Sequence, residues 1–291
     1  MKQRTIKKPV EVVGIGLHKG VPVKLRLEPM GEDSGIVFYR SDKGVSIPLK
    51  PEYVVDTKMA TVLGNEGAVV STIEHLMSAV YAFGIDNLRI VLDNDEIPIM
   101  DGSAIGFVMM LKEAGIEKLN APKKFLRVKK DVRVEDKDKF AALKPSNDIK
   151  FDFEINFDHP VIGNQKYNFK FSTKNYIEEI SKARTFGFLK EVQYLRSIGL
   201  ALGGSLENAI VLDDKGILNE SLRFPDEFVR HKILDAIGDM SLLGANFIGS
   251  YEAFASGHHL NHLLTKKAFE EDAFEVVEFS PQEMGIAKAF G

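Results

Sequence analysis

Hydrophobic and polar residues alternate along several short stretches of the first half of the chain. The clearest is residues 21–29, where Val23, Leu25 and Leu27 alternate with proline or charged neighbours. A period of two is typical of a strand with one buried face. Similar, shorter stretches predict further strands at residues 35–41, 45–51 and 87–94.

The spacing changes to a helical one in two segments between these strands and the middle of the chain. In residues 71–84, apolar side chains recur every three or four positions, and Gly84 follows as a stop signal. Residues 105–115 repeat the pattern and also end in glycine. Both segments are predicted to be helices that bury one face.

The alternating pattern begins again after a lysine-rich segment that contains Pro122. We place a domain boundary there, with residues 1–122 and 123–280 as two domains and residues 281–291 as a loose tail. In the second half, strands are predicted at residues 124–134, 139–145, 149–157 and 166–172. A helical and glycine-rich stretch follows them. This order predicts an α+β fold of two similar domains, each a mainly antiparallel sheet packed with helices, in a layered sandwich.

Residues 228–239 combine an apolar seam with an unusual polar stripe. His231, Asp235 and Asp239 recur at every fourth position, on the side of the expected helix opposite the seam. The stripe can be a solvated face with a weak histidine–aspartate pair. It also places an imidazole nitrogen beside a carboxylate oxygen, and both are ligands for a divalent metal. Two ligands do not complete a site, so both interpretations stay open.

A second candidate is the pair Glu74–His75 at the start of the first expected helix. The segment STIE (71–74) matches a capping box, in which Glu74 only closes the helix N-terminus. A metal hydrolase, in contrast, needs a histidine that binds the metal and a carboxylate that takes a proton from water. The pair alone does not decide between these roles.

Three of the seven histidines fall within residues 256–262, at an expected strand-to-helix junction. A solvated, histidine-rich turn explains this cluster without any chemistry. An imidazole at such a junction can also donate a proton, because its pKa lies close to neutral pH. His258 is then the candidate acid and Asp239 the group that holds it. Thr185 lies between an expected strand and helix, where a threonine is usually a cap.

Composition narrows the chemistry that these residues can perform. The 291 residues are 44% hydrophobic and 27% charged, as in ordinary globular proteins of about two domains. The net charge of −4 offers no argument for nucleic-acid binding. The chain has no cysteine, so any metal must be held by histidines and carboxylates. Because no secretory signal or long apolar segment is present, we expect a cytoplasmic protein without stable membrane insertion.

Seven short segments together resemble one enzyme family in their order and spacing. They are STIEHL (71–76), EIPIMDGSA (96–104), ARTFGF (183–188), LGGS (202–205), LNESLRF (218–224), EFVRHKILDAIGD (227–239) and SGHHLN (256–261). The family is UDP-3-O-acyl-N-acetylglucosamine deacetylase, the zinc amidase of lipid A biosynthesis in Gram-negative bacteria. Each segment is weak by itself, but the resemblance spans both domains, from about Thr5 to about Phe279.

The resemblance implies an active site between the domains, with one Zn²⁺ per chain and Fe²⁺ as an alternative ion. The metal ligands of the family fall on His75, His231 and Asp235, with water in the fourth position. The general base falls on Glu74 and the general acid on His258.

The resemblance also implies supporting roles for further residues. Asp239 orients the general acid, Lys232 helps to hold the substrate and favours negative charge, and Thr185 places a hydroxyl near the reacting oxygen. Other positions line the acyl-chain passage, the sugar site and the mouth of the cleft: Phe186, Phe188, Gly204, Ser205, Val211, His18 and Met59. Lys139 and Phe157 contact the nucleotide. His259 falls where the motif does not require histidine and receives no role.

The implied reaction is hydrolysis of the acetamide of UDP-3-O-acyl-N-acetylglucosamine, the committed step of lipid A biosynthesis. One alternative is a zinc amidohydrolase that acts on another N-acylated sugar. Another is a non-catalytic two-domain binding protein with a structural metal, although the sequence offers no clear fourth protein ligand to close such a site. We expect a monomer whose partner is the UDP-linked sugar.

Overall fold

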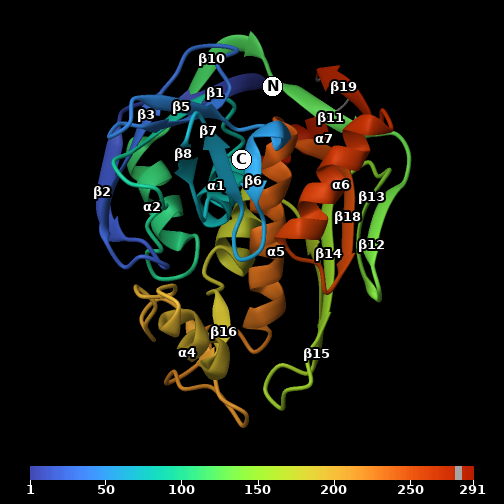
Figure 1. Ribbon diagram of the computed structural model, residues 1–291. Helices are drawn as coiled ribbons and strands as arrows, with labels where there is room; N and C mark the ends of the chain where they lie inside the picture. The colour runs from blue at the N-terminus through green and yellow to red at the C-terminus, as the bar shows by residue number, and fades with distance from the viewer. Residues whose placement is uncertain (279–283) are drawn as a thin grey trace.

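Two β-sheets enclose a layer of helices in the computed structural model, which describes residues 1–278 and 284–291 (Figure 1). Two helices, α1 (Glu74–Ala82) and α5 (Glu227–Met240), come from different halves of the chain and pack against each other at the centre. The α+β prediction is confirmed, because mainly antiparallel sheets pack against these helices.

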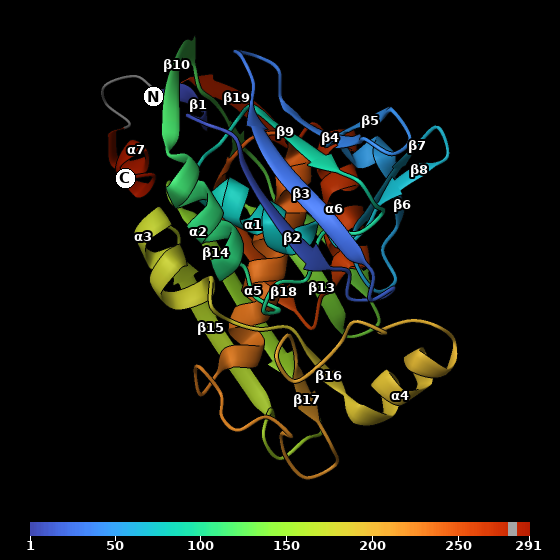
Figure 2. The same cartoon turned by 90° about the vertical axis from the view of Figure 1, so that its left-hand side faces the viewer.

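The first half contains a five-stranded sheet whose strands follow the order β2 (Val10–Ile15), β3 (Pro22–Pro29), β9 (Leu88–Leu92), β4 (Ile36–Arg40) and β5 (Val45–Pro48). Only β4 and β9 run parallel. The predicted alternation of β3 is confirmed, since Val23, Leu25 and Leu27 are all buried. Helix α2 (Ile105–Ala114) packs against β2 and α1 beside this sheet (Figure 2).

Several short elements of the first half are absent from the sequence prediction. A three-stranded sheet follows the turn η1 (Pro51–Tyr53) and consists of β6 (Val54–Asp56), β7 (Val62–Asn65) and β8 (Ala68–Val70). A separate antiparallel pair joins β1 (Lys2–Ile6) to β10 (Ile116–Pro122). These strands are short or irregular, so they lack a full alternating pattern that would mark them.

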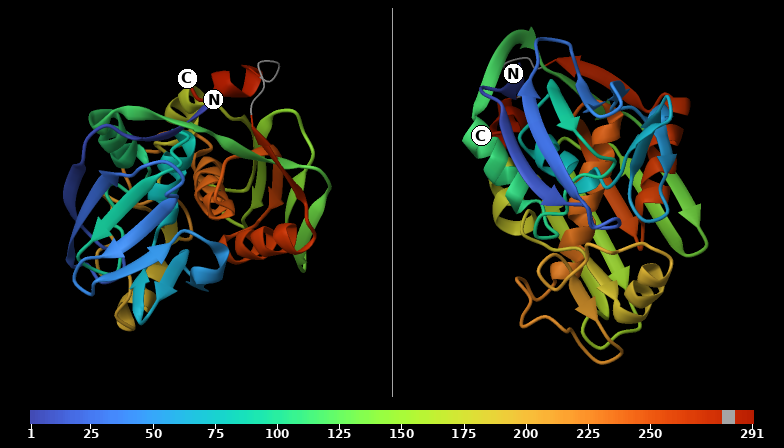
Figure 3. Two further views of the ribbon diagram at one scale, coloured as in Figure 1. Left: turned by 90° about the horizontal axis from the view of Figure 1, so that it is seen from above. Right: turned by 60° about the vertical axis from the view of Figure 1, so that its left-hand side comes forward.

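The second half is built on a seven-stranded sheet. Its main path is β12 (Val132–Asp136), β13 (Lys139–Lys144), β18 (Phe247–Phe254), β11 (Lys124–Val128) and β19 (Phe274–Glu278), while β14 (Ile149–Asn156) joins β18 to β15 (Asn164–Lys170). The segment predicted as one strand at 124–134 is divided into β11 and β12, because the chain bends at residues 129–131 between them. Helix α6 (His258–Glu270) packs on β12, β13 and α5. Seen from above, α5 lies between the sheets of the two halves (Figure 3).

Near residue 123 the chain passes from the two-stranded sheet of β1 and β10 to the seven-stranded sheet. Strand β10 pairs with β1, whereas β11 pairs with β18 and β19. The two halves nevertheless share one continuous hydrophobic core. The division into domains at 122/123 therefore stays a prediction.

The C-terminal segment differs from the loose tail predicted at residues 281–291. Residues 281–283 lie outside the described residues, but the chain then forms α7 (Met284–Ala289). Phe290 is only 2% exposed and packs on Phe125 and Phe171, and its carbonyl accepts a hydrogen bond from the Arg4 guanidinium. The described part of this segment is thus attached to the core, because burial of an aromatic ring stabilises it.

An insertion in the second half extends away from the two sheets (Figure 2). It follows the short helix α3 (Thr173–Asn175) and the π-helical turn η2 (Tyr176–Ile180), and comprises β16 (Phe186–Phe188), α4 (Leu189–Ser197) and β17 (Ile210–Leu212). The doubled glycine of the insertion, residues 203 and 204, docks on the turn after β2. Gly203 donates to the Leu17 carbonyl at 2.9 Å, and a Cβ there would lie 2.2 Å from the Gly16 carbonyl oxygen.

Among the described helices, none combines the length and apolar character needed to cross a bilayer.

Candidate active site

Three helices bring six polar side chains together in the interior. Glu74 and His75 are the first residues of α1, and His258 is the first residue of α6. The stripe on α5 contributes His231, Asp235 and Asp239, which are 2%, 8% and 2% exposed. Interpretation of the stripe as a solvated surface is therefore wrong, because α5 is covered on both its apolar and its polar side.

The capping-box interpretation of residues 71–74 is also wrong. Helix α1 begins only at Glu74, and the residue before it provides no side-chain cap. The Glu74 carboxylate instead accepts a hydrogen bond from the backbone N–H of Thr61 at 3.2 Å. Thr72 has a left-handed φ of 59°, so the chain turns too sharply here for the helix to begin at Ser71. The carboxylate of Glu74 is consequently available for other contacts.

His75, His231 and Asp235 form a compact set of donor atoms, here called the metal group. The Nε2 atoms of the two histidines lie 3.3 and 3.4 Å from the two carboxylate oxygens of Asp235. All three candidate ligand atoms lie within 4.8 Å of one another. His231 Nδ1 donates to the Ala183 carbonyl at 2.9 Å, which leaves the lone pair of Nε2 directed toward the group.

One atom of the metal group is left unsatisfied by the protein. Oδ1 of Asp235 is buried, and although His75 Nε2 lies 3.3 Å away, the oxygen accepts no hydrogen bond within the described part of the chain. A buried carboxylate oxygen without a partner is costly, and a cation would satisfy it. Two imidazoles and one carboxylate are a donor set that suits zinc or iron. The residues present therefore fit a divalent metal ion.

A second set of contacts links Glu74, His258 and Asp239. His258 Nε2 lies 3.5 Å from a Glu74 oxygen, while His258 Nδ1 lies 2.8 Å from Asp239 Oδ2. Asp239 also accepts hydrogen bonds from the Thr61 hydroxyl at 2.7 Å and the Asn261 amide at 2.8 Å. These bonds fix the carboxylate of Asp239, and it in turn fixes the ring of His258.

Burial and neighbouring charge shift the pKa values of these groups. Burial disfavours the charged form of His258, but the negative charges of Asp239 and Glu74 outweigh it and raise the pKa to about 10. Burial raises the pKa of Glu74, and the positive charges of His258 and His75 offset only part of that rise. For Asp235, burial is outweighed by the adjacent His231 and His75, which hold its pKa well below the usual range.

Three residues that sequence reasoning missed complete this arrangement. Thr61 and Asn261 hold Asp239, and Gly238 allows α1 and α5 to touch, since a Cβ there would lie 2.0 Å from the Glu74 carbonyl oxygen. A glycine inside a helical pattern is a signal that could have identified Gly238. Asn261 follows His258 by one helical turn, a spacing that places both on one face. No local signal marks Thr61.

We expect Gly238→Ala to destabilise the protein by about 1–3 kcal/mol, the usual cost of added volume in a packed core. It should also lower turnover, because α1 and α5 must separate and carry Glu74 away from its partners. Thermal denaturation and kcat/KM measure the two effects. Gly285→Ala, in a helix where a Cβ meets nothing within 4 Å, is the matched control. Wild-type stability and activity in Gly238→Ala would contradict the argument.

A cleft of about 620 Å³ opens beside the metal group. It is lined by many of the residues predicted for the site: Met59, Lys139, Phe157, Thr185, Phe186, Phe188, His231, Lys232, Asp235 and His258. The rings of Phe186 and Phe188 each lie 5.9 Å from that of Phe157. The Lys232 ammonium lies 5.9 Å from the centre of the Phe153 ring. The cleft thus has aromatic and cationic surfaces next to the buried cluster.

Four predicted substrate contacts do not line this cleft. His18 lies in the turn after β2, and its carbonyl accepts the N–H of Leu202 in the insertion. Gly204 and Ser205 follow the docked glycine of the insertion, and Val211 lies on β17 opposite Gly187. The roles of these four residues stay predictions. Thr185 is not a helix cap, because it precedes β16 and the next helix begins only at Leu189, after Phe188.

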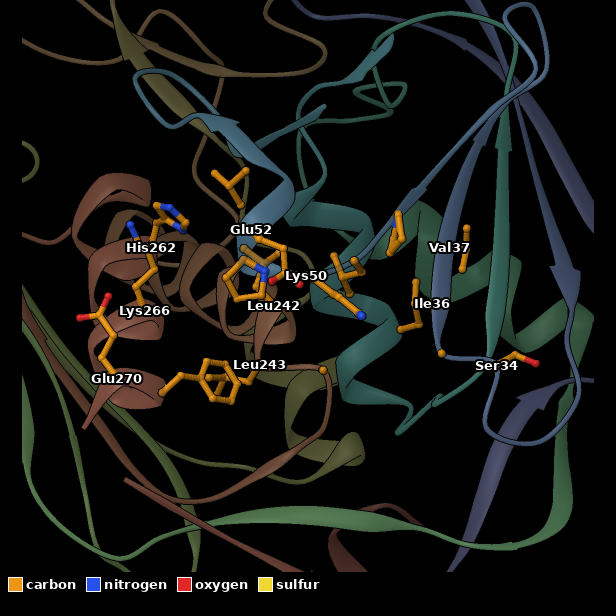
Figure 4. Close-up of a pocket in the computed structure, with 17 residues that line it drawn as sticks. Ser34, Ile36, Val37, Lys50, Glu52, Leu242, Leu243, His262, Lys266 and Glu270 are labelled. Atoms are coloured by element: carbon orange, nitrogen blue, oxygen red, sulfur yellow. The ribbon is translucent and has the colours of Figure 1, made fainter. Parts of the chain in front are cut away.

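A larger cavity, of about 780 Å³, lies elsewhere between the two halves (Figure 4). His262, Lys266 and Glu270 of α6 lie along one side of it, and Ile36 and Val37 of β4 along the other. Within residues 1–278 and 284–291, neither the metal group nor the set of Glu74, His258 and Asp239 lies in this lining. Cavity size alone therefore does not mark the candidate site.

Comparison with known proteins finds similar sequences over nearly the whole chain. The profile of the family described as UDP-3-O-acyl N-acetylglycosamine deacetylase matches residues 3–270. A protein of Nautilia profundicola named UDP-3-O-acyl-N-acetylglucosamine deacetylase is 81% identical over 291 residues, which cover 100% of both chains. A protein of the same name from Nitratiruptor sp. is 67% identical, and the match covers 96% of this chain and 95% of the relative. Another, from Helicobacter hepaticus, is 62% identical, and the match covers 100% of this chain and 98% of the relative.

Proposed function

The chain belongs to the UDP-3-O-acyl-N-acetylglucosamine deacetylase family, and on that premise we propose that it removes the acetyl group of UDP-3-O-acyl-N-acetylglucosamine in lipid A biosynthesis. The reaction is hydrolysis of an amide, which yields acetate and a free amine. The observation that carries this proposal is the position of Glu74 and His258, 3.5 Å apart, beside a group of three metal-ligating side chains.

We propose that His75, His231 and Asp235 hold one zinc ion, with ferrous iron as an alternative. The unsatisfied carboxylate oxygen of Asp235 and the fixed ring of His231 support this assignment. When bound, such an ion supplies positive charge that lowers the pKa of a water molecule and polarises the amide carbonyl.

Glu74 acts as the general base and accepts a proton from the attacking water. Its burial raises its pKa, and the carboxylate is therefore a stronger base than one in water. The Thr185 hydroxyl and the Lys232 ammonium line the cleft and stabilise the negative charge that develops on the amide oxygen. One such donor contributes about 3 kcal/mol in other hydrolases.

His258 acts as the general acid, because an amine anion cannot leave without a proton. Its Nδ1 is bound to Asp239, and Nε2, the atom nearer Glu74, delivers the proton to the departing nitrogen. The raised pKa keeps the imidazole protonated at neutral pH. Asp239 is a positioning residue in this scheme.

The remaining predicted residues distinguish the acylated, nucleotide-linked sugar from other amides. Phe186 and Phe188 offer apolar surface to the acyl chain, where each buried methylene contributes about 0.8 kcal/mol. Lys139 and Phe157 line the same cleft and contact the nucleotide. His18, Met59, Gly204, Ser205 and Val211 are proposed to border the passage and its mouth.

The proposal is tested by acetate release from two substrates at equal concentration. The metal-loaded enzyme is expected to release acetate from UDP-3-O-acyl-N-acetylglucosamine much faster than from UDP-N-acetylglucosamine, since only the first has an acyl chain to bury. Equal rates would favour an amidohydrolase for another N-acylated sugar. Metal binding without acetate from either substrate would favour a non-catalytic binding protein.

We expect kcat/KM to depend on pH as a bell-shaped curve. Activity rises as Glu74 loses its proton and falls at high pH as His258 loses its proton. Because the charge of Asp239 raises the pKa of His258, Asp239→Asn should move the alkaline limb to lower pH by at least about one unit. Asp272→Asn, at an exposed carboxylate far from the site, should leave the curve unchanged. An unmoved alkaline limb in Asp239→Asn would contradict the role of His258.

A further inference from the structure

The cleft also carries polar side chains to which the mechanism assigns no role. Thr57 and Lys58 come from the loop after β6, and His259 is the second residue of α6. All three line the cleft together with Lys139 and Lys232. Across residues 1–278 and 284–291, none of these lysine side chains has an ion-pair partner. Their ammonium groups are free to bind an anion.

His259 connects the two halves of the protein in the lining of the cleft. Its Nδ1 lies 3.2 Å from the Thr57 hydroxyl, which belongs to the first half of the chain. A hydroxyl that donates to Nδ1 leaves the hydrogen of a neutral ring on Nε2, where it can be donated to a ligand. The next histidine on the helix, His262, lines the larger cavity instead.

We propose that His259, oriented by Thr57, is a further substrate-binding residue that donates its Nε2–H to a phosphate oxygen of the UDP group. This inference rests on the proposed function, because the diphosphate belongs to that substrate. A diphosphate is the most anionic part of the molecule, and it suits a cleft lined by the unpaired ammonium groups of Lys58 and Lys139 and by an imidazole donor. The aromatic surfaces of Phe186 and Phe188 suit the acyl chain rather than a phosphate.

Calorimetric titration with UDP and with uridine, at one ionic strength, tests the inference. His259→Ala is expected to weaken UDP binding roughly tenfold, the loss of one hydrogen bond to a charged group, and to leave uridine binding unchanged. Thr57→Val should weaken UDP binding in the same direction, whereas Thr57→Ser keeps the hydroxyl and should bind as the wild type does. His262→Ala makes the same change one turn later on α6 and should bind UDP normally.

Steady-state kinetics separate binding from chemistry. His259→Ala is expected to raise KM for the UDP-linked substrate with kcat nearly unchanged, because His258 keeps its bond to Asp239. UDP affinity equal to that of the wild type, an equal loss of uridine affinity, or a fall in kcat at constant KM would each overturn the inference. If the wild type neither binds UDP nor releases acetate, the proposed function itself fails, and that result differs from all of these.

Discussion

Replacing Glu74 by alanine is expected to lower kcat by about 10² to 10⁴-fold, the range attributed to a general base in other enzymes. Glu74 is 3% exposed and its carboxylate accepts a hydrogen bond from the Thr61 backbone N–H, so the base is held in place at the start of α1. The metal group does not include Glu74, and the variant should therefore retain its metal ion. Steady-state kinetics and elemental analysis of the same preparation measure both effects.

Two further variants make the test of Glu74 specific. Glu74→Gln keeps the size of the side chain but cannot accept the proton, and it should lose nearly as much activity as Glu74→Ala. Glu113→Gln makes the same change at an exposed position on α2 and should remain fully active. Loss of metal from Glu74→Ala would show that Glu74 is a ligand, and near-normal turnover would remove it as the base.

Replacing His231 by alanine should abolish stable metal binding, and with it turnover. Loss of a hydrogen bond that orients a metal ligand lowers metal affinity by about 10- to 100-fold. The variant removes one of the three ligands itself, which is a larger change. It also removes the bond from His231 Nδ1 to the Ala183 carbonyl. After dialysis, elemental analysis should find about one metal ion per chain in the wild type and far less in the variant.

A buried histidine can also matter for folding, so His231→Ala needs a partner experiment. Asp235→Asn keeps the shape of the side chain and should lose metal in the same way, while circular dichroism reports whether each variant is folded. His262→Ala also removes a histidine, but outside the metal group, and should keep its metal. A folded His231→Ala or Asp235→Asn protein with one metal ion per chain would refute the ligand assignment.

Local pattern was sufficient for the regular elements of the fold. The alternation in residues 21–29 predicted β3, and the helical spacing in 71–84 and 228–239 predicted α1 and α5. It failed where elements are short, as in the sheet of β6, β7 and β8, whose stability depends on neighbours rather than on their own sequence. The pattern also did not predict the burial of Phe290, because one isolated aromatic residue is not part of a periodic pattern.

Sequence by itself determined the spacing of His231, Asp235 and Asp239, the pairing of Glu74 with His75, and the family resemblance. Spacing within one helix decides which side chains share a face, so these were open to prediction. Only the tertiary structure decided that this face is buried and that Thr61 binds Asp239, 178 positions away. Such contacts depend on how α1 and α5 cross at Gly238, and that geometry arises from packing between distant segments rather than from any local pattern.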